Sequence, residues 1–204
     1  MAMGRPRGFD TEAILDLIVD VFWQHGYEGT SMATLTAATG LGKPSLYAAF
    51  GSKEDLFRAA FARYRARQAT FTGNLLADPL ARAGVERLLL ALVDSQTQPG
   101  LPSGCLMVHG SLVGSIDSAR IRDELNARRK ATEAKVRERL ARAKTEGELA
   151  ADIDVSDLAR YVATVIQGLA VQAASGTPRK ALYRVVKLAM RAWPSKPLPG
   201  VGRA

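Results

Sequence analysis

Apolar residues recur along most of the chain at intervals of three and four positions, the spacing of one face of an α-helix. The first such stripe lies within residues 10–25 and consists of Ile14, Leu17, Ile18, Val21 and Phe22. Asp10 suits the N-cap of this helix, and Gly26 suits its end. No segment alternates apolar and polar residues as a half-buried strand would. The pattern therefore predicts an all-α protein with about nine helices.

The same spacing predicts where the other helices lie. They are expected at about residues 32–39, 43–50, 53–75, 85–97, 105–116, 118–145, 158–173 and 182–193. Ser31 is a candidate N-cap for the second helix, and Pro44 fits the first turn of the third, where a missing N–H costs nothing. The 118–145 helix is strongly charged. Three pairs four residues apart are expected to stabilise it: Glu124–Arg128, Glu133–Arg137 and Glu138–Arg142.

The second and third helices are short, and isolated helices of this length are unstable. They must therefore pack on the first helix, and the side chains available for this are Leu35, Leu41, Leu46 and Phe50. Two short helices joined by a turn with glycine form a helix-turn-helix unit. The second helix of such a unit fits the DNA major groove. Beside it, a Tyr47 hydroxyl and a Lys53 ammonium can reach phosphates, which set the register on a duplex.

The segment FDTEAILDLIVDVFWQHGYEGTSMATLTAATGLGKPSLYAAFGSKEDLF (9–57) carries a more specific pattern. Its elements are Phe22, the turn Gly26-Tyr27-Glu28-Gly29-Thr30-Ser31, Gly40, Leu46-Tyr47, Phe50 and Ser52-Lys53-Glu54. This pattern closely resembles the DNA-binding region of the tetracycline-repressor (TetR) family of bacterial regulators. Elsewhere the chain matches that family only in layout, apart from SGCLMVHG (103–110), which resembles one of its subgroups.

The resemblance implies a dimeric repressor with three DNA-binding helices and about six helices that bind a ligand and form the dimer. A small-molecule effector in the larger part would move the fourth helix and release double-stranded operator DNA. The resemblance assigns DNA contacts to seven residues: Tyr47 and Lys53 to phosphates, Lys43, Pro44 and Ser45 to bases, and Ser31 and Thr34 to the DNA backbone or groove edge.

Some positions depart from the family pattern or stay open. Gly42 stands where a Ser or Thr N-cap is usual, and Ala48 and Ala49 stand where a polar side chain is common. We therefore expect DNA shape and thymine-methyl contacts to contribute more to specificity than bidentate base contacts. Arg5 and Arg7 fit a mobile arm that enters the minor groove. They fit a disordered terminus equally well.

The net charge of +8 gives little support to DNA binding by the first 53 residues. That segment holds four basic residues and five acidic ones, which are Asp10, Glu12, Asp16, Asp20 and Glu28. The basic surplus lies later, since no acidic residue follows Asp157. DNA binding must therefore depend on geometry rather than on bulk charge.

Candidate effector contacts come from the fourth helix and the apolar segment 103–110. They are Phe61, Tyr64, Phe71, Cys105, Met107 and His109. The same side chains also suit a packed core, and a hydrogen-bonded core histidine is an alternative for His109. Residues 101–116 carry no Asp, Glu, Lys or Arg. We therefore expect a largely apolar effector without strong charge.

Cys105 is the one cysteine of the chain, and buried free cysteines are usually inert. It also begins a predicted helix, where a thiol pKa can fall, so modification by an electrophile or oxidant is an alternative. The chain shows no metal-ligand spacing, no cofactor motif and no nucleophile next to a base, so no catalytic residue or enzyme activity is expected. No run reaches membrane-spanning length and no signal peptide is evident. We expect a cytoplasmic protein without membrane contact.

These patterns divide the chain into three parts. Residues 1–50 are expected to bind DNA through a helix-turn-helix. Residues 51–193 are expected to bind the ligand and form a homodimer, in which the last two helices pair with their copies as a four-helix bundle. Residues 194–204, rich in Pro and Gly, are expected to be a disordered tail. The competing hypothesis is a ligand or electrophile sensor whose DNA-binding region has lost its function.

Overall fold

The computed structural model describes residues 10–72, 78–112 and 118–194, with side chains through residues 69 and 110 in the first two ranges. Every regular element in these ranges is an α-helix, as predicted. The helices are α1 (Thr11–His25), α2 (Met32–Thr39), α3 (Lys43–Phe50), α4 (Lys53–Thr72), α5 (Ala81–Gln96), α6 (Leu106–Leu112), α7 (Ala119–Thr145), α8 (Val155–Ala174) and α9 (Arg179–Arg191).

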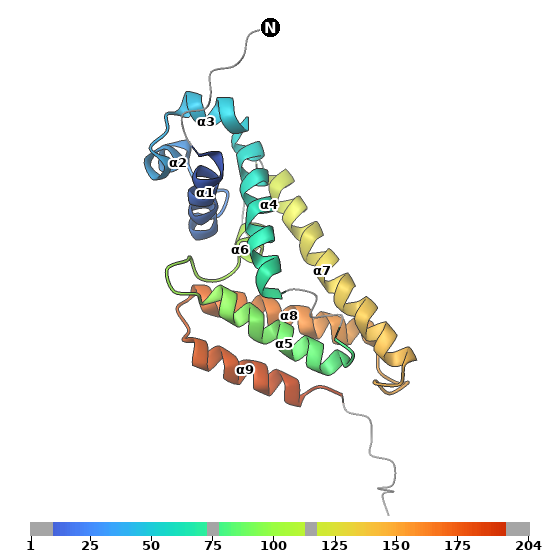
Figure 1. Ribbon diagram of the computed structural model, residues 1–204. Coiled ribbons are helices and arrows are strands. Elements are labelled where there is room, and N and C mark those ends of the chain that lie inside the picture. Colours follow the sequence, from blue (N-terminus) through green and yellow to red (C-terminus); the bar gives the residue numbers. More distant parts are fainter. Residues whose placement is uncertain (1–9, 73–77, 113–117, 195–204) are drawn as a thin grey trace, which may run out of the picture.

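The helices are arranged along one long axis (Figure 1). Helices α1, α2 and α3 form a head at one end, and α5, α8 and α9 form a base at the other. Helices α4 and α7 run between the two, and α6 lies behind α4 in this view. Helix α1 packs on α4 and α2, while α7 packs on α6 and α8. The head is therefore joined to the base chiefly through α4 and α6.

Polar caps explain several helix starts. Asp10 accepts hydrogen bonds from the backbone N–H groups of Glu12 and Ala13, and Ser31 accepts one from Thr34. Asp154 caps α8 in the same way. These side chains satisfy N–H groups that have no partner inside the helix, and the predicted caps of α1 and α2 are confirmed.

The core of the head extends beyond the first three helices. Phe22, Leu35 and Leu46 are fully buried and join α1, α2 and α3. The same cluster includes residues of α4, α6 and α7, together with Ala170 of α8. The expected boundary between residues 50 and 51 therefore does not separate two packed cores.

A second core lies in the base. It is built by α5, the C-terminal half of α7, α8 and α9, with Trp193 closing its end. Helix α5 begins at Ala81, four residues before the predicted start, because Glu148 Oε2 accepts the Ala81 N–H at 2.6 Å. This cap comes from the turn after α7, which a local sequence pattern cannot show.

The three predicted pairs within α7 are not formed. Glu124 instead pairs with Arg58 of α4, and Glu133 pairs with Arg160 of α8. Arg142 lies 3.8 Å from Glu146, four residues later. Pairs along a helix contribute only a few tenths of a kcal/mol, so neighbouring helices compete successfully for the carboxylates of Glu124 and Glu133.

Candidate nucleic-acid interface

Helix α3 presents its first turn to solvent. Lys43, Pro44 and Ser45 are exposed, and Tyr47 keeps 46% of its surface exposed, whereas Leu46 is fully buried against the head core. The N-cap residue Gly42 makes no side-chain cap, as its identity predicts. The exposed edge therefore joins a cation, a hydroxyl and a phenol with little side-chain bulk between them. Such an edge can approach the groove of a duplex closely.

The turn before α3 holds the two short helices at a fixed angle. Gly40 has φ +69° in the left-handed region, and its N–H bonds to the carbonyl of Thr36. Glycine adopts this conformation without strain. Ser31 and Thr34 lie at the start of α2, where Ser31 Oγ accepts the Thr34 N–H at 3.0 Å and lies 2.9 Å from Thr34 Oγ1. Both hydroxyls therefore serve the helix start, and Ser31 is also exposed.

Lys53 is held in place by an aromatic ring that the sequence did not identify as its partner. Its ammonium lies 4.3 Å from the centre of the Tyr27 ring, within the range of a cation–π contact. Burial lowers the pKa of Lys53, while the carboxylate of Glu28 opposes this shift. Tyr27 belongs to the Gly-Tyr-Glu-Gly turn of the family pattern, which was the one feature of the sequence that pointed to a role for this ring.

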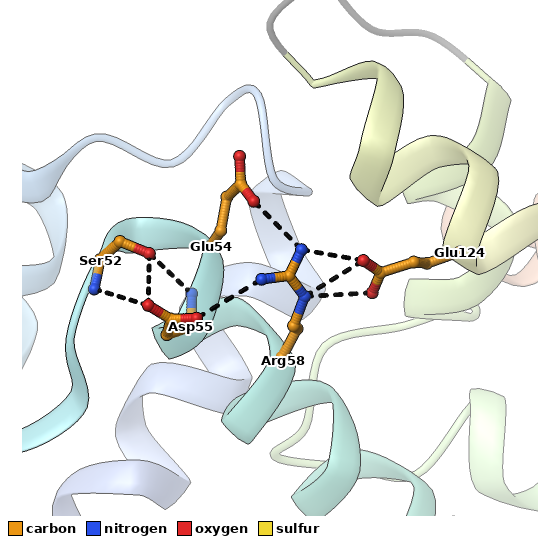
Figure 2. A network of polar contacts seen from close by, with 5 residues as sticks. All are labelled: Ser52, Glu54, Asp55, Arg58 and Glu124. Atoms are coloured by element: carbon orange, nitrogen blue, oxygen red, sulfur yellow. Dashed lines mark hydrogen bonds and ion pairs between the residues drawn. The ribbon is translucent and has the colours of Figure 1, made fainter.

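The start of α4, beside Lys53, is fixed by a reciprocal cap (Figure 2). Ser52 Oγ accepts the Asp55 N–H at 3.1 Å, and Asp55 Oδ2 accepts the Ser52 N–H at 3.0 Å. Hydrogen bonds from Ser52 lower the pKa of Asp55. The cap resembles a capping box and fixes the direction in which α4 leaves the head.

One turn further along α4, Arg58 contacts three carboxylates (Figure 2). Its Nη2 lies 2.8 Å from Glu124 of α7 and 3.0 Å from Glu54, and its Nη1 lies 3.4 Å from Asp55. The hydrogen bonds to Glu124 raise the pKa of Arg58 above its ordinary value. Arg58 therefore ties the first turns of α4 to the start of α7.

The acidic residues of the head are engaged by α4. Arg63 Nε lies 2.6 Å from Asp16, and Arg63 Nη1 lies 2.7 Å from Glu12. Arg67 pairs with both Asp16 and Asp20. Hydrogen bonding from Arg63 lowers the pKa of Asp16. Three of the five acids of the head are therefore paired with arginines of α4, and a fourth, Asp10, caps α1.

Most of the candidate effector residues lie in or against the head core. Tyr64 is 3% exposed, and its hydroxyl donates to Cys105 Sγ at 3.5 Å. Burial raises the pKa of Tyr64. Phe61 stacks on this ring at 6.3 Å, and Met107 packs against the same cluster. The side chain of Phe71 and the residues Arg5 and Arg7 lie outside the described part of the chain.

His109 has a different setting. It is half-buried, and burial lowers its pKa, which favours the neutral imidazole. It lines a cleft of about 490 Å³ together with residues of α1 and of the segment between α5 and α6. Neither Tyr64 nor Cys105 lines this cleft. Among the candidates whose side chains are described, His109 alone lines this cleft.

Sequence reasoning missed the junction between head and base. The buried Trp23 of α1 donates its indole N–H to the carbonyl of Gly104 at 3.2 Å. Gly104 has φ +85°, and an added Cβ would lie 2.6 Å from the His109 ring and 2.9 Å from the Ala170 carbonyl. Only glycine fits there. The sequence showed this glycine only as part of the SGC motif, because its partner Trp23 lies 81 residues away.

The described residues contain no group of three or more His, Cys, Asp or Glu that could hold a metal ion. Within the same ranges, no helix is both long and apolar enough to cross a membrane.

The fold and the exposed edge of α3 define a helix-turn-helix regulator with a larger helical part. Comparison with known families identifies the family of regulators. The model of bacterial regulatory proteins of the tetR family matches residues 14–60, and that of the tetracyclin repressor-like C-terminal domain matches residues 80–189. The chain belongs to the TetR family of bacterial transcriptional regulators.

Several relatives match along most of their length. The transcriptional repressor ComR of Escherichia coli K12 is 35% identical over 193 residues, covering 94% of this chain and 92% of ComR. The regulator YezE of Bacillus subtilis 168 is 30% identical, covering 78% of this chain and 84% of YezE. A cysteine-substituted form of the TetR-family regulator CifR, solved with 26-bp operator DNA, is 46% identical with a TM-score of 0.88, covering 93% of this chain and all of CifR.

Proposed function

We propose that this protein is a homodimeric repressor that binds a near-palindromic operator in double-stranded DNA and is released by a small-molecule effector. Residues 1–50 would bind the DNA, and residues 51–193 would bind the effector and form the dimer. The protein would act in the cytoplasm, without catalysis, because its DNA target lies there. The similarity to CifR, a regulator solved with operator DNA, supports the DNA-binding part of this proposal.

The observation that carries the proposal is the exposed edge of α3. Its first turn exposes the Lys43 ammonium and the Ser45 hydroxyl, and Tyr47 exposes an aromatic ring beside them. Lys43, Pro44 and Ser45 would face the bases, with Tyr47 and Lys53 on phosphates. Ser31 and Thr34 would lie at the groove edge, and Arg5 and Arg7 would enter the minor groove.

The homodimer is supported by an exposed apolar surface on α8 and α9. This dimer surface consists of Tyr161, Val171, Val185 and Leu188, which are between 37% and 59% exposed. Exposed apolar side chains grouped on two adjacent helices are typical of subunit contacts. A two-fold axis through this surface would present two α3 helices to two half-sites.

An effector contact by Phe61, Tyr64, Phe71, Cys105, Met107 and His109 is retained as part of the proposal. Phe61 and Tyr64 stack on each other, and the Tyr64 hydroxyl bonds to Cys105. An apolar effector would therefore have to displace core contacts in order to bind there. The competing hypothesis of a sensor without DNA binding predicts that the protein binds an effector but no DNA.

A double variant tests the proposal: Tyr47→Phe with Lys53→Ala. The DNA probe is the region upstream of the gene that encodes the chain, in a fluorescence anisotropy titration at moderate salt. Each subunit loses two phosphate contacts, and the one made by Lys53 is charged, so binding should weaken by about tenfold or more and its salt dependence should fall.

The matched control is Lys130→Ala, which removes an exposed lysine of α7 whose ammonium forms no hydrogen bond or ion pair with any described residue. It should change affinity by less than about twofold. Unchanged binding by the double variant would refute the α3 assignment. Absence of DNA binding by the wild-type protein, with effector binding intact, would favour the sensor hypothesis.

A further inference from the structure

A cleft lies where the head meets the rest of the molecule. One wall is the C-terminal half of α1, with Asp20 and Gln24, and the other contains Leu101, Pro102, Ser103 and His109. In Figure 1 the segment that joins α5 to α6 loops out below α1. The volume, about 490 Å³, is that of a small-molecule site. It is thus lined by both parts that the proposed function separates.

The polar groups of this cleft have unused hydrogen-bonding capacity. Within the described ranges, the side chains of Gln24, Ser103 and His109 make no hydrogen bond. Asp20 uses one oxygen, Oδ1, for Arg67 at 3.0 Å, which leaves Oδ2 without a described partner. A neutral imidazole, an amide, a hydroxyl and a carboxylate oxygen can all accept a hydrogen bond.

The charges select the kind of ligand. Among the described residues that line the cleft there is no Lys or Arg, whereas the carboxylate of Asp20 is present. The neighbouring cation, Arg67, is shared between Asp16 and Asp20. An anion would therefore meet a carboxylate without a free counter-charge. An ammonium group would find acceptors on both walls of the cleft, and Leu101 and Pro102 would cover its carbon skeleton.

We propose that this cleft binds a small organic cation, a primary ammonium carried on a polar skeleton, and that its occupancy changes the position of α1 relative to α6. The regulatory half of this proposal rests on the proposed function. Trp23 lies next to Gln24 and is hydrogen-bonded to Gly104, so a ligand between α1 and the 100–103 segment bears directly on that junction. The site is polar, unlike the apolar effector site expected from the sequence.

Three sugars of one ring type serve as probes: glucosamine is cationic, N-acetylglucosamine neutral and glucuronate anionic. The readout is the pair of indole N–H signals in ¹⁵N NMR spectra, since the chain has two tryptophans. Trp23 precedes the cleft residue Gln24 and donates to Gly104, whereas Trp193 lies in the base and is the internal control. Glucosamine should shift the Trp23 signal alone, with saturation below about 50 mM. Glucuronate should not shift it.

Two variants locate the binding. Asp20→Asn removes the carboxylate and Gln24→Ala removes an exposed amide, so the second is expected to fold even if the first does not. Either variant should weaken glucosamine binding, and Asp20→Asn should weaken it by about tenfold. Asp152→Asn changes an exposed aspartate far along the chain and should leave binding unchanged. Equal shifts of both tryptophans, equal binding of glucuronate, or wild-type affinity in both cleft variants would overturn the site.

Operator affinity then tests the coupling. Saturating glucosamine should weaken DNA binding at least severalfold, and DNA should weaken glucosamine binding by the same factor. Glucuronate at equal ionic strength is the control for screening. Glucosamine binding without any effect on DNA affinity would overturn the regulatory half alone. If the protein bound no DNA, the proposed function would fail while the NMR titration still reported on the cleft.

Discussion

Gly104 connects the two parts of the molecule through its backbone rather than through a side chain. Its carbonyl accepts the Trp23 indole, and its Cα faces His109, Ala170 and Ala174. A residue with any side chain would have to displace a backbone carbonyl and a helix methyl group at the same time. The position therefore holds α1, α6 and α8 together at a single point.

Replacing Gly104 by Ala should destabilise the protein by about 2–4 kcal/mol, since left-handed strain adds to the steric overlap. Gly100→Ala is the matched control. Gly100 also has a positive φ, +80°, but nothing lies within 4 Å of an added Cβ. Gly100→Ala should therefore lower the free energy of unfolding only by the left-handed strain, about 1–2 kcal/mol. Urea unfolding followed by circular dichroism measures both, and equal losses would contradict the crowding at Gly104.

Cys105 is expected to behave as a core residue. It is 9% exposed and accepts the Tyr64 hydroxyl, so a reagent reaches it only after local opening. A thiol reagent such as DTNB should therefore react at least about tenfold more slowly with the native protein than with the protein in urea. The variant Tyr64→Phe keeps the ring and should preserve most of this protection. Fast native labelling would instead support the electrophile-sensor hypothesis.

At the scale of elements, local patterns predicted the head well. The bounds of α2 and α3 agree with the structure to the residue, because the start signals, the Ser31 cap and Pro44, and the glycine stops are local. The start of α5 and the pairing of Glu124 were wrong because both depend on partners from distant segments, Glu148 and Arg58. The Trp23–Gly104 bond and the cleft were missed for the same reason. Periodicity shows which face is buried but not what covers it.

The contact between α4 and α7 makes a prediction about Arg58. Arg58→Ala should cost more stability than Glu124→Ala, since Arg58 also contacts Glu54 and Asp55. The Arg58–Glu124 coupling should be about 0.2–1 kcal/mol in a double-mutant cycle and should shrink in high salt, because both groups are well exposed. Urea unfolding of the four variants measures it. The exchanged pair, Arg58→Glu with Glu124→Arg, should not restore stability, because three carboxylates would then share one turn of α4.

At the scale of the whole molecule, α4, α6 and α7 connect the head to the base. The described connections include the Arg58–Glu124 pair between α4 and α7, the Trp23–Gly104 hydrogen bond and the buried cluster shared with α4 and α6. Deleting α8 and α9 would not be a clean test of the dimer. Both helices supply buried residues to the base core, so a truncated chain would lose its fold together with its partner.

Surface substitutions separate dimerisation from folding. Val185 and Leu188 lie one turn apart on α9, exposed by 44% and 59%, while Leu182 and Val186 point into the core. Val185→Lys with Leu188→Lys should spare that core. It should still break the dimer, because α9 already carries five basic residues and no acidic one. Light scattering should then report a single 21.9 kDa chain.

The monomer should bind the operator at least about 100-fold more weakly, since the second recognition helix no longer acts at high effective concentration. Leu80→Lys is the control, because Leu80 is 60% exposed but lies outside α8 and α9. It should remain dimeric with wild-type affinity. A folded monomer that bound the operator as tightly as the wild type would show that one α3 helix suffices and that the symmetric arrangement plays no part in recognition.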